Sequence, residues 1–320
     1  MRRRRGQPVS GVLLLDKPTG VSSNHALQVA RRQLDAAKAG HTGTLDPLAS
    51  GLLPLCFGEA TKVSQFLLGA DKTYRASARL GITTSTGDAE GEVLRERPVA
   101  VDAGRLAAAL AAHTGDLQQI PPMYSALKHD GERLYALARR GETVERPARS
   151  VRVSRLELTH MDADGFEVEL DCSKGTYVRS LIEDIGEALG CGAHITALRR
   201  LRVGALDVGR AVTLETLCGL AQSDPQALGA CLVPIADALA HLPQMELSPD
   251  DAANLQLGRA LTLRQPMADG WVVVFTASQV FVGMAEAADG RLLPRRLVSQ
   301  EPGLVAPTSD PCLSQAPARG

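Results

Sequence analysis

The chain has 320 residues, of which 44% are hydrophobic and 22% charged, so it can form a large domain with a sizeable core and a smaller second domain. The formal net charge of -1 excludes a uniformly basic coat for nucleic acid, although local basic patches can exist. The six cysteines form no Cys-x-x-Cys pair and the start has no signal-peptide pattern, so we expect reduced thiols and a cytoplasmic protein.

The two ends of the chain differ in composition from the rest. The start, MRRRRGQP, is strongly basic, and the apolar run GVLLL behind it is too short for a signal sequence or a membrane span. Residues 1–9 are therefore either a disordered basic arm or an arm that binds phosphate groups. Residues 300–320 are rich in Pro, Ser, Gly and Ala and are predicted to be disordered.

Apolar periodicity and capping residues predict the elements of the first half of the chain. They are a buried strand at 11–15, a helix that starts after Ser22 or Ser23, a short helix within 59–72, a strand from Tyr74 to Leu80 and an alanine-rich helix at 102–112. In the strand, every second residue from Tyr74 is apolar, which is typical of a strand with one buried face.

The second half begins with residues 121–149, which are polar and basic and predict an exposed loop–helix–loop excursion. A strand at 166–172, a helix at 181–189 closed by Gly190 and a strand-like stretch at 194–204 follow. From residue 243 several short strands indicate a small β-barrel of about 55 residues. Because strands and helices do not alternate regularly, we predict an α+β fold.

Metal and nucleotide sites are not indicated. No two of the seven histidines are spaced i, i+4, and none has a cysteine at ligand spacing. The stretch GADKT lacks the glycines of a phosphate-binding loop, and no Gly-x-Ser-x-Gly motif occurs. We therefore predict no metal and no cofactor.

Four residues in glycine- and proline-framed stretches attract attention. Asp46, in GHTGTLDP, has no opposite charge nearby in sequence, so it either forms an Asp-Pro turn or has a chemical role. Arg179 lies near a helix start, where a cation is unfavourable, which suggests a partner carboxylate or a phosphate. Taken alone, Tyr74 is interpreted as an aromatic residue at the edge of the core, and Lys17 as a solvent-exposed lysine in a turn.

Together, five stretches resemble, in order and spacing, the bacterial TruB family of tRNA pseudouridine synthases. They are GVLLLDKPTGVSS, GHTGTLDPLASGLLPLCFGEATK, DKTYRA, PPMYSALK and SKGTYVRSLIEDIGEALGCGAH. The resemblance covers about residues 10–300. It implies a catalytic domain at 10–243, with a mixed, largely antiparallel central sheet flanked by helices and an RNA-clamping insert at about 121–149. It also implies a PUA-like RNA-binding β-barrel at 244–299.

The resemblance also assigns catalytic roles. Asp46 matches the family's essential aspartate, which acts as a nucleophile or stabilises charge at C1′ of the ribose. Arg179 matches an arginine that would hold Asp46 through a charge-assisted bidentate pair. Tyr74 matches a tyrosine that stacks on the flipped base and carries a proton.

Other matched residues would contact RNA or line the uracil pocket. His41 would hold the rearranged RNA loop, unless it is a loop histidine satisfied by backbone. Lys17 would either brace its loop or attract phosphate. Tyr177 and Leu198 would line the pocket, although Leu198 is equally suited to the core. In the insert, phosphate contacts would come from Lys128, Arg133, Arg139 and Arg140.

The resemblance implies an isomerase that converts uridine to pseudouridine at position 55 in the T-loop of tRNA, with the T-arm stem-loop as its partner. Nothing in the sequence suggests a membrane partner or more than a monomer. Two alternatives stay open: an RNA-binding chaperone of tRNA folding, and a guide-RNA-dependent relative. The long insert and the self-contained length favour the stand-alone form over the guide-dependent one.

Overall fold

The computed structural model describes residues 6–278 and 280–298. Most of the predicted basic arm and the predicted tail at 300–320 lie outside these ranges. Within the arm, the Gln7 N–H donates to the Asp35 carbonyl (2.5 Å) and Val9 is buried, so the chain packs on the following residues before residue 10. None of the helices in the described ranges is long and apolar enough to cross a membrane.

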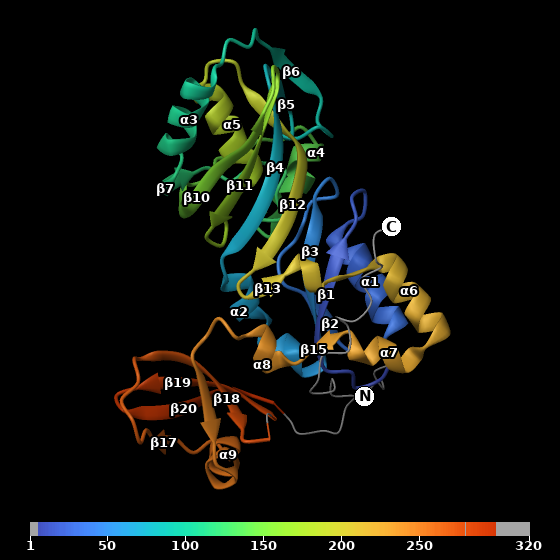
Figure 1. Ribbon diagram of the computed structural model, residues 1–320, viewed down its shortest axis with the longest axis vertical. Coiled ribbons are helices and arrows are strands. Elements are labelled where there is room, and N and C mark those ends of the chain that lie inside the picture. Colours follow the sequence, from blue (N-terminus) through green and yellow to red (C-terminus); the bar gives the residue numbers. More distant parts are fainter. Residues whose placement is uncertain (1–5, 279, 299–320) are drawn as a thin grey trace, which may run out of the picture.

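An eleven-stranded sheet forms the body of the molecule (Figure 1). Its main path is β14 (Val212–Thr213), β1 (Gly11–Lys17), β3 (Ser50–Phe57), β12 (Ala193–Val203), β4 (Lys72–Leu80), β11 (Gly165–Cys172), β10 (Arg149–Met161) and β7 (Gly115–Gln119). Three short strands attach to this path: β2 (Ala39–His41), β13 (Leu206–Asp207) and β15 (Leu232–Val233). Only the β1–β14 and β12–β3 pairs among these strands are parallel. The predicted mixed, largely antiparallel sheet is confirmed.

Helices cover both halves of the sheet. In Figure 1, α3 (Ala103–Ala112) and α5 (Val178–Ala188) lie beside β4, β10 and β11, whereas α1 (Ser23–Gln33), α6 (Leu214–Ser223) and α7 (Pro225–Ala230) lie beside β1. Shorter elements are η1 (Gly58–Lys62), α2 (Ser64–Gly69), η2 (Val208–Arg210) and α8 (Ile235–Ala238). The predicted caps are confirmed, because Ser22 accepts from the backbone N–H of His25 and Gly190 has φ +85° after α5.

Strand β4 shows the predicted alternation. Its residues 74, 76, 78 and 80 are buried and face the core that includes α5, whereas Arg75 and Arg79 are exposed. Strand β11 alternates in the same way. The two faces of this half of the sheet are thus chemically distinct: one packs against helices, and the other carries charged side chains.

Strand β3 joins the two halves of the sheet, and it was not predicted. Its stretch SGLLPLCF contains glycine and proline, yet it is almost entirely buried. Strand β3 pairs with β12 through Arg199↔Ser50 and Arg200↔Gly51 alone within the described residues. Gly51 has φ +99°, and a Cβ there would collide with the backbone of Arg200, so only glycine fits this junction.

Two excursions leave the sheet. The hairpin of β5 (Ile82–Thr84) and β6 (Val93–Glu96) was not predicted. The insert at 121–149 contains a small hairpin, β8 (Lys128–His129) with β9 (Glu132–Arg133), followed by α4 (Leu134–Arg139). Most of the insert is exposed, as predicted for a loop–helix–loop excursion.

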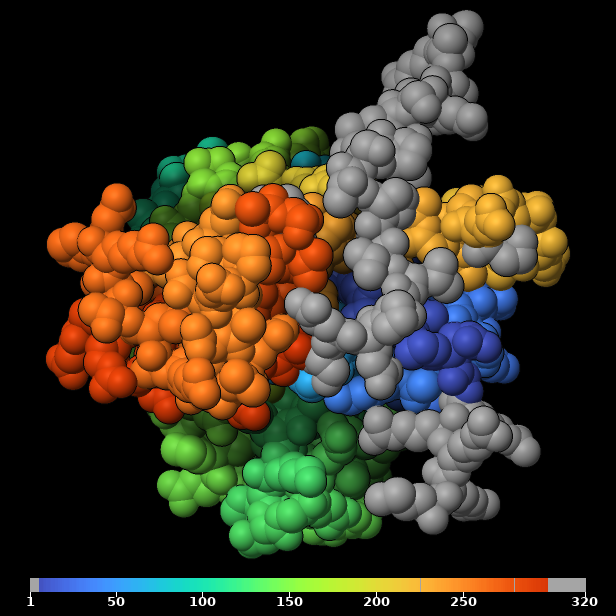
Figure 2. Space-filling view, turned by 90° about the horizontal axis from the view of Figure 1, so that it is seen from below, coloured from blue at the N-terminus to red at the C-terminus, as the bar shows by residue number. Residues whose placement is uncertain are grey.

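The C-terminal unit is a five-stranded sheet in the order β16 (Gln244–Leu247), β18 (Gly270–Thr276), β19 (Phe281–Ala288), β20 (Arg291–Leu297) and β17 (Leu261–Thr262), with α9 (Pro249–Gln256). The sheet curls as a half-barrel, which fits the predicted PUA-like fold. It packs on the part of the chain that forms the large sheet, because Phe66 and Trp271 meet edge to face with centroids 4.9 Å apart. Figure 2 shows this unit beside the rest of the molecule.

Candidate active site

Asp46 lies in the turn between β2 and β3. Its carbonyl accepts a hydrogen bond from the Ala49 N–H (3.1 Å), which closes the turn. Its side-chain Oδ2 lies 2.8 Å from Nη2 of Arg179, and 41% of the Asp46 side chain is exposed. The residue is therefore both a turn-former and a reachable carboxylate, so the two interpretations of the sequence are compatible.

Arg179 is the second residue of α5, and only 6% of its side chain is exposed. Its Nη1 donates to the Thr86 carbonyl (2.8 Å) and its Nη2 to the Tyr124 carbonyl (2.8 Å). Nη1 also lies 3.5 Å from Oδ2 of Asp88, a buried carboxylate between β5 and β6. The guanidinium is thus shared between Asp46 and Asp88, whereas the sequence predicted a fork on Asp46 alone.

The charge state of Asp46 depends on this arrangement. Burial raises the pKa of the Asp46 carboxyl above its usual range, and the Arg179 guanidinium opposes the rise. Asp88 adds a like charge that raises the pKa of Asp46 further. Arg179 is therefore the main group that favours an ionised Asp46.

Tyr74 is buried on β4, next to Arg200 on β12 in the strand register. Burial raises the pKa of Tyr74, while the charge of Arg200 and a hydrogen bond from it oppose the rise. The ordinary pKa of tyrosine is already about 10, so the hydroxyl keeps its proton near neutral pH.

Lys17 ends β1 and is completely buried. Its Nζ donates to the carbonyls of Pro18 (2.9 Å) and Val21 (2.7 Å), and burial lowers its pKa to about 8. Lys17 therefore braces the loop that follows β1. It is not the solvated turn lysine that its place before a proline suggests.

His41, Tyr177 and Leu198 occupy different surroundings. The Nδ1 of His41 is buried and has no hydrogen-bond partner in the described part of the chain, so backbone groups do not satisfy this atom. Tyr177 precedes α5, and its N–H donates to Oε1 of Gln119 (2.7 Å). Leu198 is buried in the core, opposite Ala76 in the register, although it also lines a cavity.

The four basic residues predicted in the insert do not behave alike. Lys128 and Arg133 are exposed on the β8–β9 hairpin, and Arg139 lies over the ring of Tyr135 (5.6 Å to its centroid). Arg140 is held by two ion pairs, to Glu132 and to Glu142. Within the described ranges, Lys128 and Arg133 have no ion pair, so their charges are the more available.

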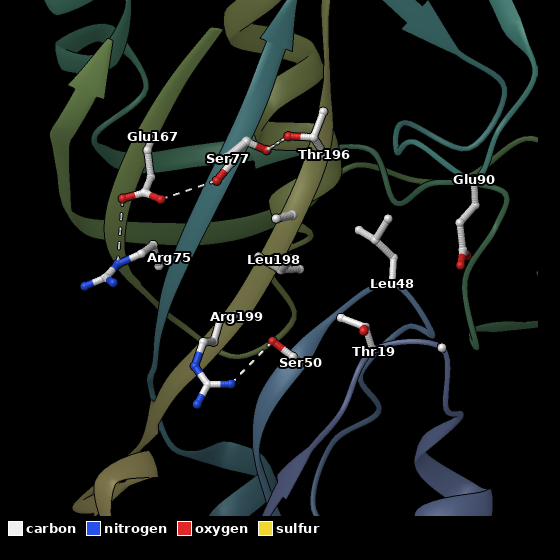
Figure 3. Close-up of a pocket in the computed structure, with 12 residues that line it drawn as sticks. Thr19, Leu48, Ser50, Arg75, Ser77, Glu90, Glu167, Thr196, Leu198 and Arg199 are labelled. Atoms are coloured by element: carbon white, nitrogen blue, oxygen red, sulfur yellow. Dashed lines mark hydrogen bonds and ion pairs between the residues drawn. The ribbon is translucent and has the colours of Figure 1, made fainter. Parts of the chain in front are cut away.

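A cavity of about 440 Å³ lies where β3 and β12 diverge. Figure 3 shows Leu48, Thr19 and Glu90 on one side of it and Leu198 on the other. The remaining lining residues are Gly20, Ser50, Arg75, Ser77, Glu167, Thr196, Ala197 and Arg199. Asp46, Tyr74 and Arg179 do not line this cavity, although Leu48, which does, lies two residues after Asp46 in the sequence.

Sequence reasoning missed Asp88 and Arg200. Asp88 lies in the polar loop TGDAEG, which reads as a turn. Arg200 lies in the run RRLR, within the stretch 194–204 that was predicted to be strand-like but was given no role in the site. The spacing of these residues along the chain gives no signal, because their partners come from distant segments.

Three family models match consecutive parts of the chain. Residues 31–178 match the TruB family pseudouridylate synthase N-terminal domain. Residues 179–240 match the tRNA pseudouridylate synthase B C-terminal domain, and residues 243–298 match the C-terminal domain described as pseudouridine synthase II TruB.

Individual relatives agree with these matches. A tRNA pseudouridine synthase B of Pseudomonas aeruginosa is 51% identical, covering 92% of this chain and 98% of its own length. One of Azoarcus sp. is 52% identical, covering 92% and 97%. A crystal structure of a Cbf5-Nop10-Gar1 complex is similar with a TM-score of 0.69 and 26% identity, covering 92% of this chain and 85% of that one. The protein described here belongs to the TruB family of pseudouridine synthases.

Proposed function

We propose that this protein isomerises uridine to pseudouridine at position 55 in the T-loop of tRNA. The observation that carries the proposal is the half-exposed Asp46 carboxylate, 2.8 Å from the buried Arg179 guanidinium. Relatives about half identical over most of the chain, named tRNA pseudouridine synthase B, support tRNA as the substrate.

The reaction needs no net exchange of atoms. The bond between N1 of uracil and C1′ of ribose breaks, a bond between C5 and C1′ forms, the hydrogen on C5 leaves as a proton, and N1 gains a proton. An ionised carboxylate can attack C1′, as in glycosidases, or C6 of the base, and the position of Asp46 suits either route. The target base must first flip out of the RNA, which costs a few kcal/mol.

Tyr74 supplies a flat aromatic face with a hydroxyl that keeps its proton. A phenol can stack on the flipped uracil and take part in proton transfer at its edge. Leu198 and Tyr177 contribute an apolar wall that limits access of water to the reacting bond.

RNA contacts outside the reacting base come from two regions. The insert presents the exposed Lys128 and Arg133. Burial lowers the pKa of His41, and the charges of Arg200 and Arg133 lower it further, so Arg133 lies near this histidine. The C-terminal unit, 244–298, serves as the second RNA-binding region. One chain supplies Asp46, Tyr74 and Arg179, so we further propose that the protein acts as a monomer, on cytoplasmic tRNA.

The test uses purified protein and an isolated T-arm hairpin that carries [5-³H]uridine. Loss of the C5 hydrogen releases tritium to water, so we expect release in proportion to product at position 55. The matched control is a hairpin with cytidine at that position, which should release nothing. No release from the uridine hairpin would contradict the proposal. Release only after adding a guide RNA would indicate the guide-dependent alternative, and improved tRNA folding without release would indicate a chaperone.

The role of the insert has its own test. The double variant Lys128→Ala and Arg133→Ala should weaken RNA binding and reduce the slope of log affinity against log salt by up to about 2, one for each lost phosphate contact. Arg140→Ala is the matched control, because its charge is already neutralised by Glu132 and Glu142. An equal salt effect in both would contradict the assignment of phosphate contacts to the hairpin.

A further inference from the structure

Arg200 is the largest completely buried side chain near the active site, with 1% of the residue exposed. It belongs to a group of buried cations that also includes Lys17, Lys72 and Arg179. Arg179 faces two carboxylates, and the two lysines donate to backbone carbonyls. Arg200 has no role in the proposed reaction so far.

The surroundings of Arg200 join three parts of the site. Its Nε donates to the Leu52 carbonyl on β3 (2.7 Å), and its Nη2 donates to the Gly43 carbonyl (3.3 Å), three residues before Asp46. In the strand register, Arg200 lies between Gly51 on β3 and Tyr74 on β4. The guanidinium thus contacts the loop that presents Asp46, and Arg200, the sheet neighbour of Tyr74, also hydrogen-bonds to that tyrosine.

Among the described residues, no carboxylate lies within ion-pair distance of this guanidinium. Removing a charge from water without a counter-ion is unfavourable, by several kcal/mol for a single ion even after relaxation. Backbone carbonyls offset part of this. A neutral amide side chain such as that of glutamine could donate to the same carbonyls without this penalty, so a bracing role alone does not explain a charge here.

The chemistry of the guanidinium restricts its neighbour. Arginine has five N–H donors and no acceptor, whereas a phenol can donate one hydrogen bond and accept others. When the two meet, the Tyr74 oxygen must accept and its own hydrogen must point away from Arg200. We propose that Arg200 is a positioning residue that makes Tyr74 a directed hydrogen-bond donor toward the flipped uracil.

This role has a consequence for proton transfer. If the phenol gives its proton to the substrate, negative charge develops on the Tyr74 oxygen, and the adjacent fixed guanidinium stabilises it without reorganisation of solvent. The inference rests on the proposed function of Tyr74, and its first test is independent of activity.

The first test is NMR of protein labelled with ¹⁵N-arginine, wild type against Tyr74→Phe. The side-chain N–H signals of Arg200, assigned by their loss in Arg200→Lys, should shift when the phenol oxygen is removed, because one acceptor is lost. Arg202 is the control, since it lies on the same strand, is exposed and is paired with Asp207 at 2.8 Å. Unchanged Arg200 signals in Tyr74→Phe would overturn the proposal. An arginine variant is needed only to assign these signals, and the comparison itself uses the wild type and Tyr74→Phe.

The second test is a double-mutant cycle on kcat with the T-arm hairpin. Arg200→Lys should lower kcat on the order of 30-fold in the wild-type background, within the range of acid–base contributions, with KM little changed. In the Tyr74→Phe background the same substitution should lower kcat by less than about threefold. Equal losses in both backgrounds would show that Arg200 does not act through Tyr74.

Arg202→Lys, with the same chemical change, should leave kcat unaltered in both backgrounds. If the hairpin is not a substrate at all, the cycle gives no rates and the proposed function fails, whereas the NMR comparison still reports on the Arg200–Tyr74 contact. The two failures are therefore distinguishable. If Arg200→Lys does not fold, an Arg200→Gln variant serves for assignment, and the NMR result alone decides.

Discussion

Arginines occupy both faces of the sheet around β4, and they are paired differently on each. On the outer face, Arg75 and Arg155 form a network with Glu167, Glu169 and Asp171. On the inner face, Arg179 has one half-exposed and one buried carboxylate partner, whereas Arg200 donates to two backbone carbonyls and to Tyr74 and has no ion pair among the described residues.

The two faces therefore use charge for different ends. The outer-face network consists of those five residues and is open to solvent. Hydrogen bonds from Arg155 lower the pKa values of Glu169 and Asp171. In such pairs the opposite charges largely cancel, so little electrostatic potential is left to attract a ligand. On the inner face, Arg200 is desolvated and has no carboxylate partner among the described residues, so we expect a substrate that enters to meet preorganised positive charge. The predictions below test this contrast.

The largest effect is expected for Asp46→Asn. The amide keeps the size of the side chain but cannot attack carbon, so product formation should fall by about 10⁴-fold or more. Binding to the hairpin should change by less than about threefold, because the turn and its partners remain. Tritium release under single turnover and filter binding measure the two quantities.

Asp171→Asn is the control from the outer-face network, and it should keep full activity. Activity of Asp46→Asn within tenfold of the wild type would refute a chemical role for this carboxylate.

Arg179→Lys should come next. A lysine provides a single point charge, which cannot reach Asp46, Asp88 and the Thr86 carbonyl together. Activity should fall on the order of 100-fold, with a much smaller change in RNA affinity. Arg155→Lys is matched on the outer face and should change neither quantity.

A parallel loss of affinity and activity in Arg179→Lys would indicate that Arg179 contacts phosphate. Loss of activity alone supports its role in holding Asp46.

A smaller effect concerns the pH dependence of stability. Burial raises the pKa of Glu183, one turn after Arg179 on α5, to about 7. The folded state then binds the proton more tightly than the unfolded state, so stability falls as pH rises from about 4.5 to 7. Glu183→Gln mimics the protonated form and should raise Tm at pH 8, by the equivalent of roughly 1 kcal/mol after allowing for partial exposure, but not at pH 4.5.

Glu187→Gln on the same helix is the control with the opposite sign. Its pairing with Arg97 lowers the pKa of Glu187, so the charged form contributes stability above the unfolded pKa, and this contribution is lost as pH falls. Removing the charge should therefore lower Tm slightly at pH 8. An increase in both variants would show that general repulsion, not burial at Glu183, controls the pH response.

The smallest effect is expected on the outer face. Arg155→Gln breaks contacts with Asp171 and Glu169, yet these groups are partly exposed, so the free energy of unfolding should fall by less than about 1 kcal/mol per pair. Activity should remain unchanged. Denaturant unfolding measures the free energy of unfolding, and tritium release measures activity. A tenfold loss of activity would show that the outer-face network also contributes to the reaction.

Local patterns predicted the elements that have a regular apolar period. The alternation from Tyr74 to Leu80, the cap at Ser22 and the glycine after α5 each follow from short-range steric and hydrogen-bonding preferences, and all three are present. The missed strand β3 has no such period, because both of its faces are buried and its glycine and proline resemble turn residues.

The site required information that one segment does not contain. Asp46 and Arg179 are far apart in the chain, so their pairing was inferred only from a resemblance and from the unfavourable place of a cation at a helix start. Asp88 and Arg200 gave no pattern, since a buried charge in sequence looks like an exposed one. Lys17 illustrates the same problem, because only the fold reveals that its ammonium group is enclosed by carbonyls.

The residues of the candidate site lie on both sides of the junction between β3 and β12. The β3 side of this junction carries the turn with Asp46, and the β12 side, with β4 and α5, carries Tyr74 and Arg179. Two residue pairs, Arg199 with Ser50 and Arg200 with Gly51, join β12 to β3 within the described residues. We expect a side chain at position 51 to push the strands apart and to misalign Asp46 with Arg179, although it would touch neither residue. We therefore expect the alignment of Asp46 with Arg179 to depend on the absence of a side chain at position 51.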